Sequence, residues 1–143
     1  MSAAPASSVL WVHDAMLSAR WLRPGEPAVF VFDEGWIADA GLSLKRLVFM
    51  AEAVEAMPGV QVRRGDPVEE VLAFAQESRA GVVRTVDAAY PRLRRQRERI
   101  AGTLELELTR PPAFVDKAVP PEDLRSFSRY WKKHGKSVRR PTR

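Results

Sequence analysis

Five side chains that can take part in chemistry near neutral pH follow the ends of apolar segments in this sequence. Histidine titrates near neutrality and can move a proton. Carboxylates accept hydrogen bonds from ribose hydroxyls or ring N–H groups, and a tyrosine offers a ring and a hydroxyl. The candidate ligand-binding residues are His13, Asp14, Asp33, Asp87 and Tyr90.

Apolar segments rich in valine and aromatic residues predict the strands that position these side chains. The first, second and fourth segments are almost continuously apolar, which is typical of parallel strands covered on both faces. The fifth alternates leucine with glutamate, which is typical of an edge strand with one face in water. The predicted strands are residues 9–12, 28–32, 60–62, 82–86 and 103–108.

Helical patterns separate these strands. Asp66 and Pro67 begin the clearest helix, at 66–75, because an acidic cap and a proline at the first helical position favour a start there. Ser43 begins another helix, and residues 14–22 and 91–100 are further candidates. The Ser43 helix has an apolar stripe, typical of a helix packed on a core. Its members are Leu44, Leu47, Val48, Ala51 and Val54.

Alternating strands and helices predict an α/β fold with right-handed crossovers. We expect a five-stranded parallel, Rossmann-like sheet in the order 3-2-1-4-5 with helices on both faces. Ligands bind such sheets outside the carboxyl ends of the strands, where the strand order reverses. The five candidate side chains all follow strands that end in that crevice.

The basic charge is concentrated at one end of the chain. The net charge of +5 over 143 residues contains eight Lys or Arg residues and no acid between 125 and 143. We therefore predict a flexible N-terminus (1–8), an α/β domain (9–110), and a proline-punctuated connector with a short helix and a basic tail (111–143).

The composition excludes several classes of protein. The absence of cysteine excludes disulfides, thiolate nucleophiles and cysteine-bearing zinc sites, and with two histidines we expect no metal site. No apolar run reaches the length of about 20 residues that spans a bilayer, and the first eight residues lack a signal-peptide pattern. We expect a cytoplasmic protein that does not bind membranes.

Arginines at 92–99 and the basic tail combine cations with aromatic rings, a pairing that favours nucleic acid. A solubilising tail, or one that docks on a protein, is the alternative interpretation. The candidate contacts to DNA or to a protein partner are Arg94, Arg95, Arg129, Tyr130, Trp131, Lys132, Lys133, Arg139 and Arg140.

Each crevice residue also has a structural interpretation. His13 and Asp14 can cap a following helix, and aspartates at strand ends commonly shape turns. Gly65-Asp66-Pro67 is typical of an anion-binding loop or of a simple turn and cap, and Asp66 favours the second because it brings its own charge. A hydrolase or transferase using His13 with Asp14 or Asp87 would need a second activating group, which the sequence does not supply.

The ordered segments resemble the N-terminal α/β, antenna-type domain of the DNA photolyase and cryptochrome family. The most specific match is the Gly-Asp-Pro turn between strand and helix. The similar segments are 9–12, 28–33, 46–52, 62–67 with 70–72, and 127–131. The sequence departs from the family at 11–17, where arginines are missing, and at Tyr90-Pro91, where the family often has Tyr-Glu.

The resemblance implies an accessory, chromophore-binding half of a light-driven repair enzyme. In the family, the flavin adenine dinucleotide and the lesion pocket belong to a larger helical domain. We therefore expect no photorepair by this chain alone and no binding of FAD or folate. A flavin or deazaflavin antenna is the cofactor that the resemblance favours. A flavin-bearing photolyase-type protein or DNA is the expected partner.

Overall fold

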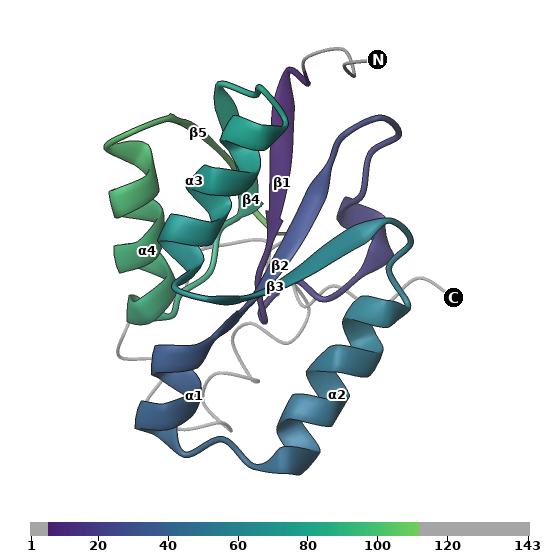
Figure 1. The fold of residues 1–143 in the computed structure, drawn as a ribbon, viewed down its shortest axis with the longest axis vertical. Helices are drawn as coiled ribbons and strands as arrows, with labels where there is room; N and C mark the ends of the chain where they lie inside the picture. The colour runs from purple at the N-terminus through teal and green to yellow at the C-terminus, as the bar shows by residue number, and fades with distance from the viewer. Residues whose placement is uncertain (1–5, 112–143) are drawn as a thin grey trace, which may run out of the picture. The chain divides into compact units, whose positions relative to one another are not determined.

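The structure, a computed structural model, describes residues 6–111, and Figure 1 shows a single parallel sheet at its centre. The strand order is β3-β2-β1-β4-β5, and every neighbouring pair is parallel. The predicted α/β fold and strand order are therefore confirmed. The strands are β1 (Ser8–Val12), β2 (Ala28–Asp33), β3 (Val60–Gly65), β4 (Val82–Val86) and β5 (Glu105–Thr109).

Four α-helices and one short 3-10 helix connect the strands. The predicted starts are confirmed: the Ser43 hydroxyl accepts a hydrogen bond from the Arg46 N–H at 3.2 Å, and Asp66 accepts one from the Val68 N–H at 2.9 Å. The helices are η1 (Ala19–Trp21), α1 (Glu34–Ala40), α2 (Leu44–Glu55), α3 (Pro67–Glu77) and α4 (Pro91–Ala101).

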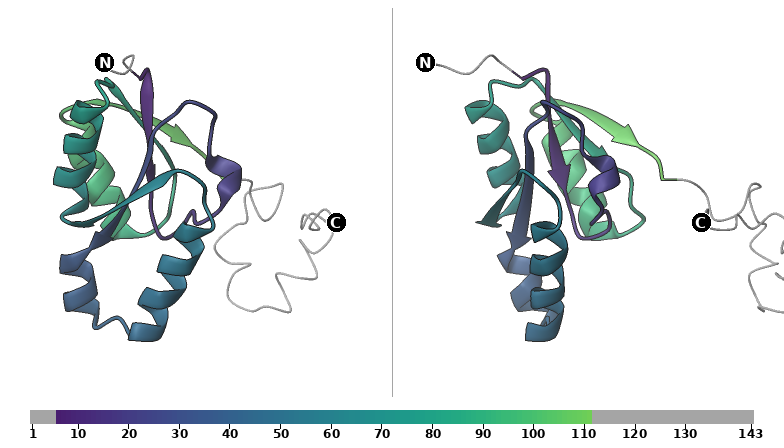
Figure 2. Two further views of the ribbon diagram at one scale, coloured as in Figure 1. Left: turned by 45° about the vertical axis from the view of Figure 1, so that its right-hand side comes forward. Right: turned by 90° about the vertical axis from the view of Figure 1, so that its right-hand side faces the viewer.

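Helices cover both faces of the sheet, as expected, with α3 and α4 on one face and α2 on the other (Figure 2). Alternate residues of β1 pack on opposite faces of the sheet. Val9 and Trp11 pack in the core under α3 and α4, and Leu10 packs in the core that includes Met50 of α2. The central position of β1, β2 and β4 explains why these strands are the apolar ones.

The prediction of a helix at 14–22 is wrong. Residues 14–15 form a turn, and only Ala19–Trp21 form a short 3-10 helix before the chain reaches Gly25, whose φ is 77°. A tertiary contact replaces the helix. Arg84 of β4, 2 % exposed, donates to the Trp21 carbonyl at 2.6 Å and to Glu26 at 2.6 Å. This buried guanidinium holds the connection in an irregular conformation that local sequence does not predict.

The helix α1 is absent from the sequence prediction, although its boundaries carry signals. Asp33 accepts a hydrogen bond from the Trp36 N–H at 3.0 Å, and Gly41 ends the helix with a φ of 60°. An aspartate cap and a glycine seven residues after Glu34 are a sequence signature of a short helix. Its effect is to place Trp36 beside the end of β2.

The apolar stripe of α2 is only partly buried. Val54 is buried and Leu47 half-buried, but Leu44 is 76 % exposed and Val48 45 % exposed. Met50, outside the predicted stripe, is 3 % exposed and faces the sheet. The helix is therefore rotated from the expected orientation, and one apolar side of it is uncovered.

Two ends of the chain, residues 1–5 and 112–143, lie outside the described part. These ends contain the predicted helix within 122–133 and the predicted contacts Arg129, Tyr130, Trp131, Lys132, Lys133, Arg139 and Arg140.

Residue contacts divide the chain between Arg110 and Pro111, and β1 begins at Ser8. None of the helices within 6–111 is both long and apolar enough to cross a bilayer.

Candidate functional site

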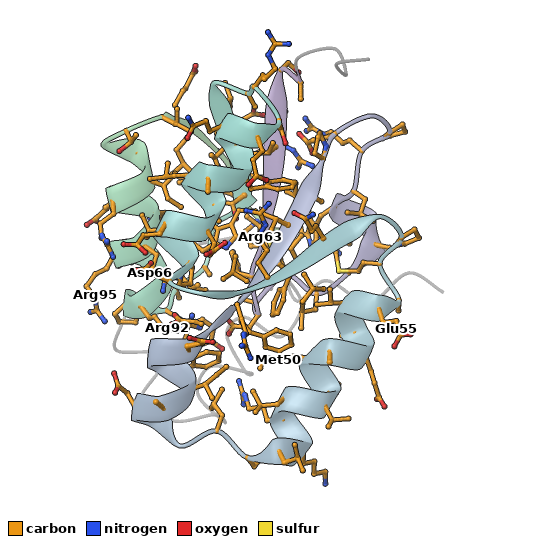
Figure 3. The ribbon with its side chains drawn as sticks, in the orientation of Figure 1. Met50, Glu55, Arg63, Asp66, Arg92 and Arg95 are labelled. Carbon is orange, nitrogen blue, oxygen red and sulfur yellow. The ribbon has the colours of Figure 1, made fainter. Side chains whose placement is uncertain are left out.

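A cleft of about 860 Å³ lies at the carboxyl ends of the strands. Asp14 follows β1, Asp33 is the last residue of β2, and Asp66 follows β3. Helices α3 and α4 begin at the rim of the cleft with Pro67 and Pro91. Figure 3 shows Asp66, Arg92 and Arg95 on the side of the molecule where α1, α3 and α4 meet. The cleft therefore occupies the predicted crevice at the reversal of strand order.

A polar network forms the floor of the cleft. Arg92 donates to Asp14 at 2.6 Å and lies 3.6 Å from Asp33. Gln96, one turn along α4, donates to the same Asp33 carboxylate at 2.7 Å. Because both carboxylates are largely buried, these contacts fix their positions.

Gln96 leaves one polar atom without a partner. Its Oε1 atom is buried, and within residues 6–111 nothing hydrogen-bonds to it. Reversing the amide would turn its oxygen toward the Asp33 carboxylate, so the orientation is fixed by that contact. Among the described residues, Gln96 therefore leaves a buried acceptor without a partner beside the cleft.

The cleft lining carries five carboxylates and four guanidinium groups. Arg92 is paired with Asp14 and Asp33, and Arg99 lies 3.7 Å from Asp66. Among the described residues, Arg46 and Arg95 have no carboxylate within ion-pair distance, and both are exposed. These two are the cations available to an anionic ligand.

Two aromatic rings border the cleft. Tyr90 precedes α4 and is 58 % exposed, so its ring is accessible. Trp36 is half-buried, and the Arg92 guanidinium covers its ring at 3.7 Å from the centroid. Tyr90 is therefore the open stacking surface, and Trp36 supports the floor.

His13 lies below the cleft and is 4 % exposed. Its Nε2 donates to the Val86 carbonyl at 2.8 Å, and its Nδ1 accepts from the Ala15 N–H at 3.2 Å. Burial lowers the pKa of His13, although the Val86 hydrogen bond acts in the opposite direction. Both ring nitrogens are occupied by backbone, so His13 acts as a neutral bridge between the ends of β1 and β4.

Asp87, like His13, does not line the cleft. It forms an ion pair with Arg97 of α4, and a hydrogen bond from that guanidinium lowers the pKa of the carboxyl. The structure thus brings together Asp14, Asp33 and Tyr90 at the cleft and separates Asp87 from them. Of the predicted α4 contacts, Arg95 lines the cleft, while Arg94 is exposed outside it.

Sequence reasoning missed Trp36, Arg46, Arg92, Gln96 and Arg99 as cleft residues. A signal for the last three was present: with Arg95 they follow Pro91 at helical spacing and therefore share one side of α4. Arg46 depends on the position of α2, for which the sequence has no signal. Within the described chain, no group of three or more His, Asp or Glu side chains is placed to hold a metal ion.

Comparison of the chain with protein-family models, curated proteins and solved structures found no match. The resemblance to photolyase antenna domains therefore stays a prediction from the sequence.

Proposed function

We propose that this domain is a photolyase- and cryptochrome-like ligand-binding module that holds a flavin- or deazaflavin-type chromophore and has no photorepair catalysis of its own. The observation that supports the proposal most directly is the cleft at the carboxyl ends of a 3-2-1-4-5 sheet. That position is where open α/β sheets bind nucleotide-like ligands.

The donors and acceptors of the cleft fit such a ligand. Tyr90 offers a ring face for stacking, and Arg95 offers a guanidinium for a phosphate. The Asp33 carboxylate, which lines the cleft, offers an acceptor for hydroxyl or ring N–H groups. Because Arg92 pairs with both Asp14 and Asp33 and offsets one of their two negative charges, an anionic ligand meets less repulsion than the number of carboxylates suggests.

Titration of the purified chain with flavin mononucleotide, followed by flavin fluorescence, tests the proposal. Replacing Arg95 with alanine removes a charge-assisted hydrogen bond, and we expect Kd to rise about tenfold or more. Arg94→Ala is the matched control, because this neighbouring exposed arginine does not line the cleft. Riboflavin, which lacks the phosphate, should lose little affinity in either variant.

Failure to take up flavin mononucleotide or a deazaflavin would contradict the proposal. An equal loss in the Arg94 and Arg95 variants would contradict the assignment of the phosphate to the cleft. Tyr90→Ala adds an independent measurement, because loss of a stacking ring should raise Kd about tenfold for riboflavin and flavin mononucleotide alike.

A nucleic-acid-binding accessory protein is the second candidate, favoured by the exposure of Arg94 and Arg95 on α4. Arg92 and Arg97 contribute less, because carboxylates pair with both. The basic tail would add phosphate contacts from residues outside the described range.

The salt dependence of duplex DNA binding tests this candidate. Each phosphate that the protein neutralises contributes a slope of about −0.9 in log K against log salt. Replacing Lys132, Lys133, Arg139 and Arg140 together with alanine should make the slope shallower by that amount for each phosphate that the variant no longer neutralises. DNA affinity and slope that do not change would remove the tail from the interface.

A further inference from the structure

The uncovered side of α2 forms part of an apolar groove. Val48 and Ala51 line it from α2, Phe32 and Ile37 line it from β2 and α1, and its volume is about 420 Å³. Val62 of the edge strand β3 is also exposed, at 52 %. Figure 1 shows α2 at the β3 side of the sheet, where no further strand follows.

The charges of α2 are arranged against its own dipole. Lys45 and Arg46 lie in the first turn, and Glu52 and Glu55 lie toward the carboxyl end, and all four are exposed. Helices are stabilised by acids in the first turn and bases in the last, so this order weakens an isolated helix. In residues 6–111 none of these four side chains forms an ion pair.

A second antiparallel copy of α2 would be complementary in charge and shape. Lys45 and Glu52 are seven residues apart, which is two helical turns, so they lie on the same side of α2 next to the apolar stripe. When two such helices pack antiparallel about a two-fold axis near Val48, Lys45 of each faces Glu52 of the other. The stripe of each helix then fills the groove of its partner.

We propose that this protein forms a two-fold symmetric dimer through the α2 groove, with the two α2 helices antiparallel. The occupant of the groove is a second copy of the chain, because the same surface supplies both complementary halves. Met50 points from α2 toward the sheet of its own chain, whereas Glu55 points away from it (Figure 3). The groove and the ligand cleft share α1 and α2, but Val48, Lys45 and Glu52, on which the inference depends, do not line the cleft.

Sedimentation equilibrium of the full-length chain tests the dimer. We expect a mass of twice 16.1 kDa at high concentration, falling to that of a monomer on dilution. Val48→Glu places two carboxylates together in an apolar contact and should weaken the dimer about 100-fold. Leu108→Glu is the matched control: Leu108 is 39 % exposed but lies on β5, at the opposite edge of the sheet from β3, so the dimer should persist.

Charge reversal tests the antiparallel arrangement. Lys45→Glu or Glu52→Lys alone creates two like-charge contacts per dimer, and each should weaken association about tenfold. The double variant restores both contacts and should restore the dimer. The dimer Kd of the double variant is the informative quantity, and thermal stability is not. Exchanging the two charges also places them favourably with respect to the dipole of α2, so it would raise thermal stability even in a monomer.

If the chain stays monomeric at its highest soluble concentration, the groove binds a different protein and the proposal is overturned. A dimer that tolerates Val48→Glu would also overturn it, by placing the interface elsewhere. Single reversals that weaken the dimer without rescue in the double variant would exclude the antiparallel arrangement.

Discussion

Replacing Glu26 with glutamine should lower the free energy of unfolding by about 3–5 kcal/mol, the typical cost of removing one partner from a buried ion pair. Arg84 and Glu26 have side chains that are only 2 % and 6 % exposed, and the guanidinium contacts both carboxylate oxygens. Without the carboxylate, Arg84 keeps a buried charge with no anionic partner, and its acceptors are neutral carbonyl oxygens such as that of Trp21. Denaturant unfolding followed by circular dichroism measures the loss.

Glu34→Gln is the control for this prediction. Glu34 pairs with Arg64 at 3.5 Å, but both side chains are more than half exposed, and such pairs contribute about 0–1 kcal/mol. A double variant, Arg84→Met with Glu26→Leu, removes both charges and should recover much of the stability. A loss below about 1 kcal/mol in Glu26→Gln would show that water reaches the pair.

The same pair predicts acid sensitivity. Burial on its own raises the pKa of Glu26, but hydrogen bonds from Arg84 and Ser8 together outweigh it and hold the pKa below the usual value of 4.5. A carboxyl with a lowered folded-state pKa contributes its full stability above the unfolded value and loses it as the pH falls. Wild-type stability should therefore fall more steeply below pH 4.5 than that of Glu26→Gln.

Replacing His13 with alanine should cost about 2–4 kcal/mol at pH 7, because the Val86 carbonyl and the Ala15 N–H lose their partner and a cavity opens. Burial holds the pKa of His13 below its usual 6.5 despite Asp14 and Asp87 nearby, with Arg92 acting in the same direction as burial. The unfolded chain therefore binds the proton first as the pH falls.

The free energy of unfolding of the wild type should accordingly decrease as the pH drops below 6.5. Above pH 6.5, His13 should contribute no pH dependence. In His13→Ala that segment of the pH profile should become flat, while above about pH 7 the two proteins should differ by a constant. Unfolding curves measured between about pH 5 and 8 provide the comparison. An equal slope in both proteins would assign the pH dependence to another group.

Local sequence features predicted the helices and strands whose positions depend on local interactions. The caps at Ser43 and Asp66 determine where α2 and α3 begin, and the apolar runs determine which strands are central. The resulting strand order also placed Asp14, Asp33 and Tyr90 correctly at the cleft. Asp33 and Gly41 mark the two ends of α1 as clearly as Ser43 and Asp66 mark the starts of α2 and α3. The helix between them is short, however, and has little periodic apolar pattern.

Other features were decided by contacts between residues distant in sequence, and the tertiary structure alone shows them. The Arg84–Glu26 pair joins residues 58 positions apart and replaces the helix predicted at 14–22. His13 bonds a carbonyl 73 residues away, which makes it a structural bridge instead of a cleft residue. The rotation of α2 about its own axis depends on which side of the helix the sheet covers. The sheet covers the side with Met50 and leaves Val48 exposed. Sequence periodicity measures how apolar a helix face is, but neighbouring elements decide which part of that face is buried.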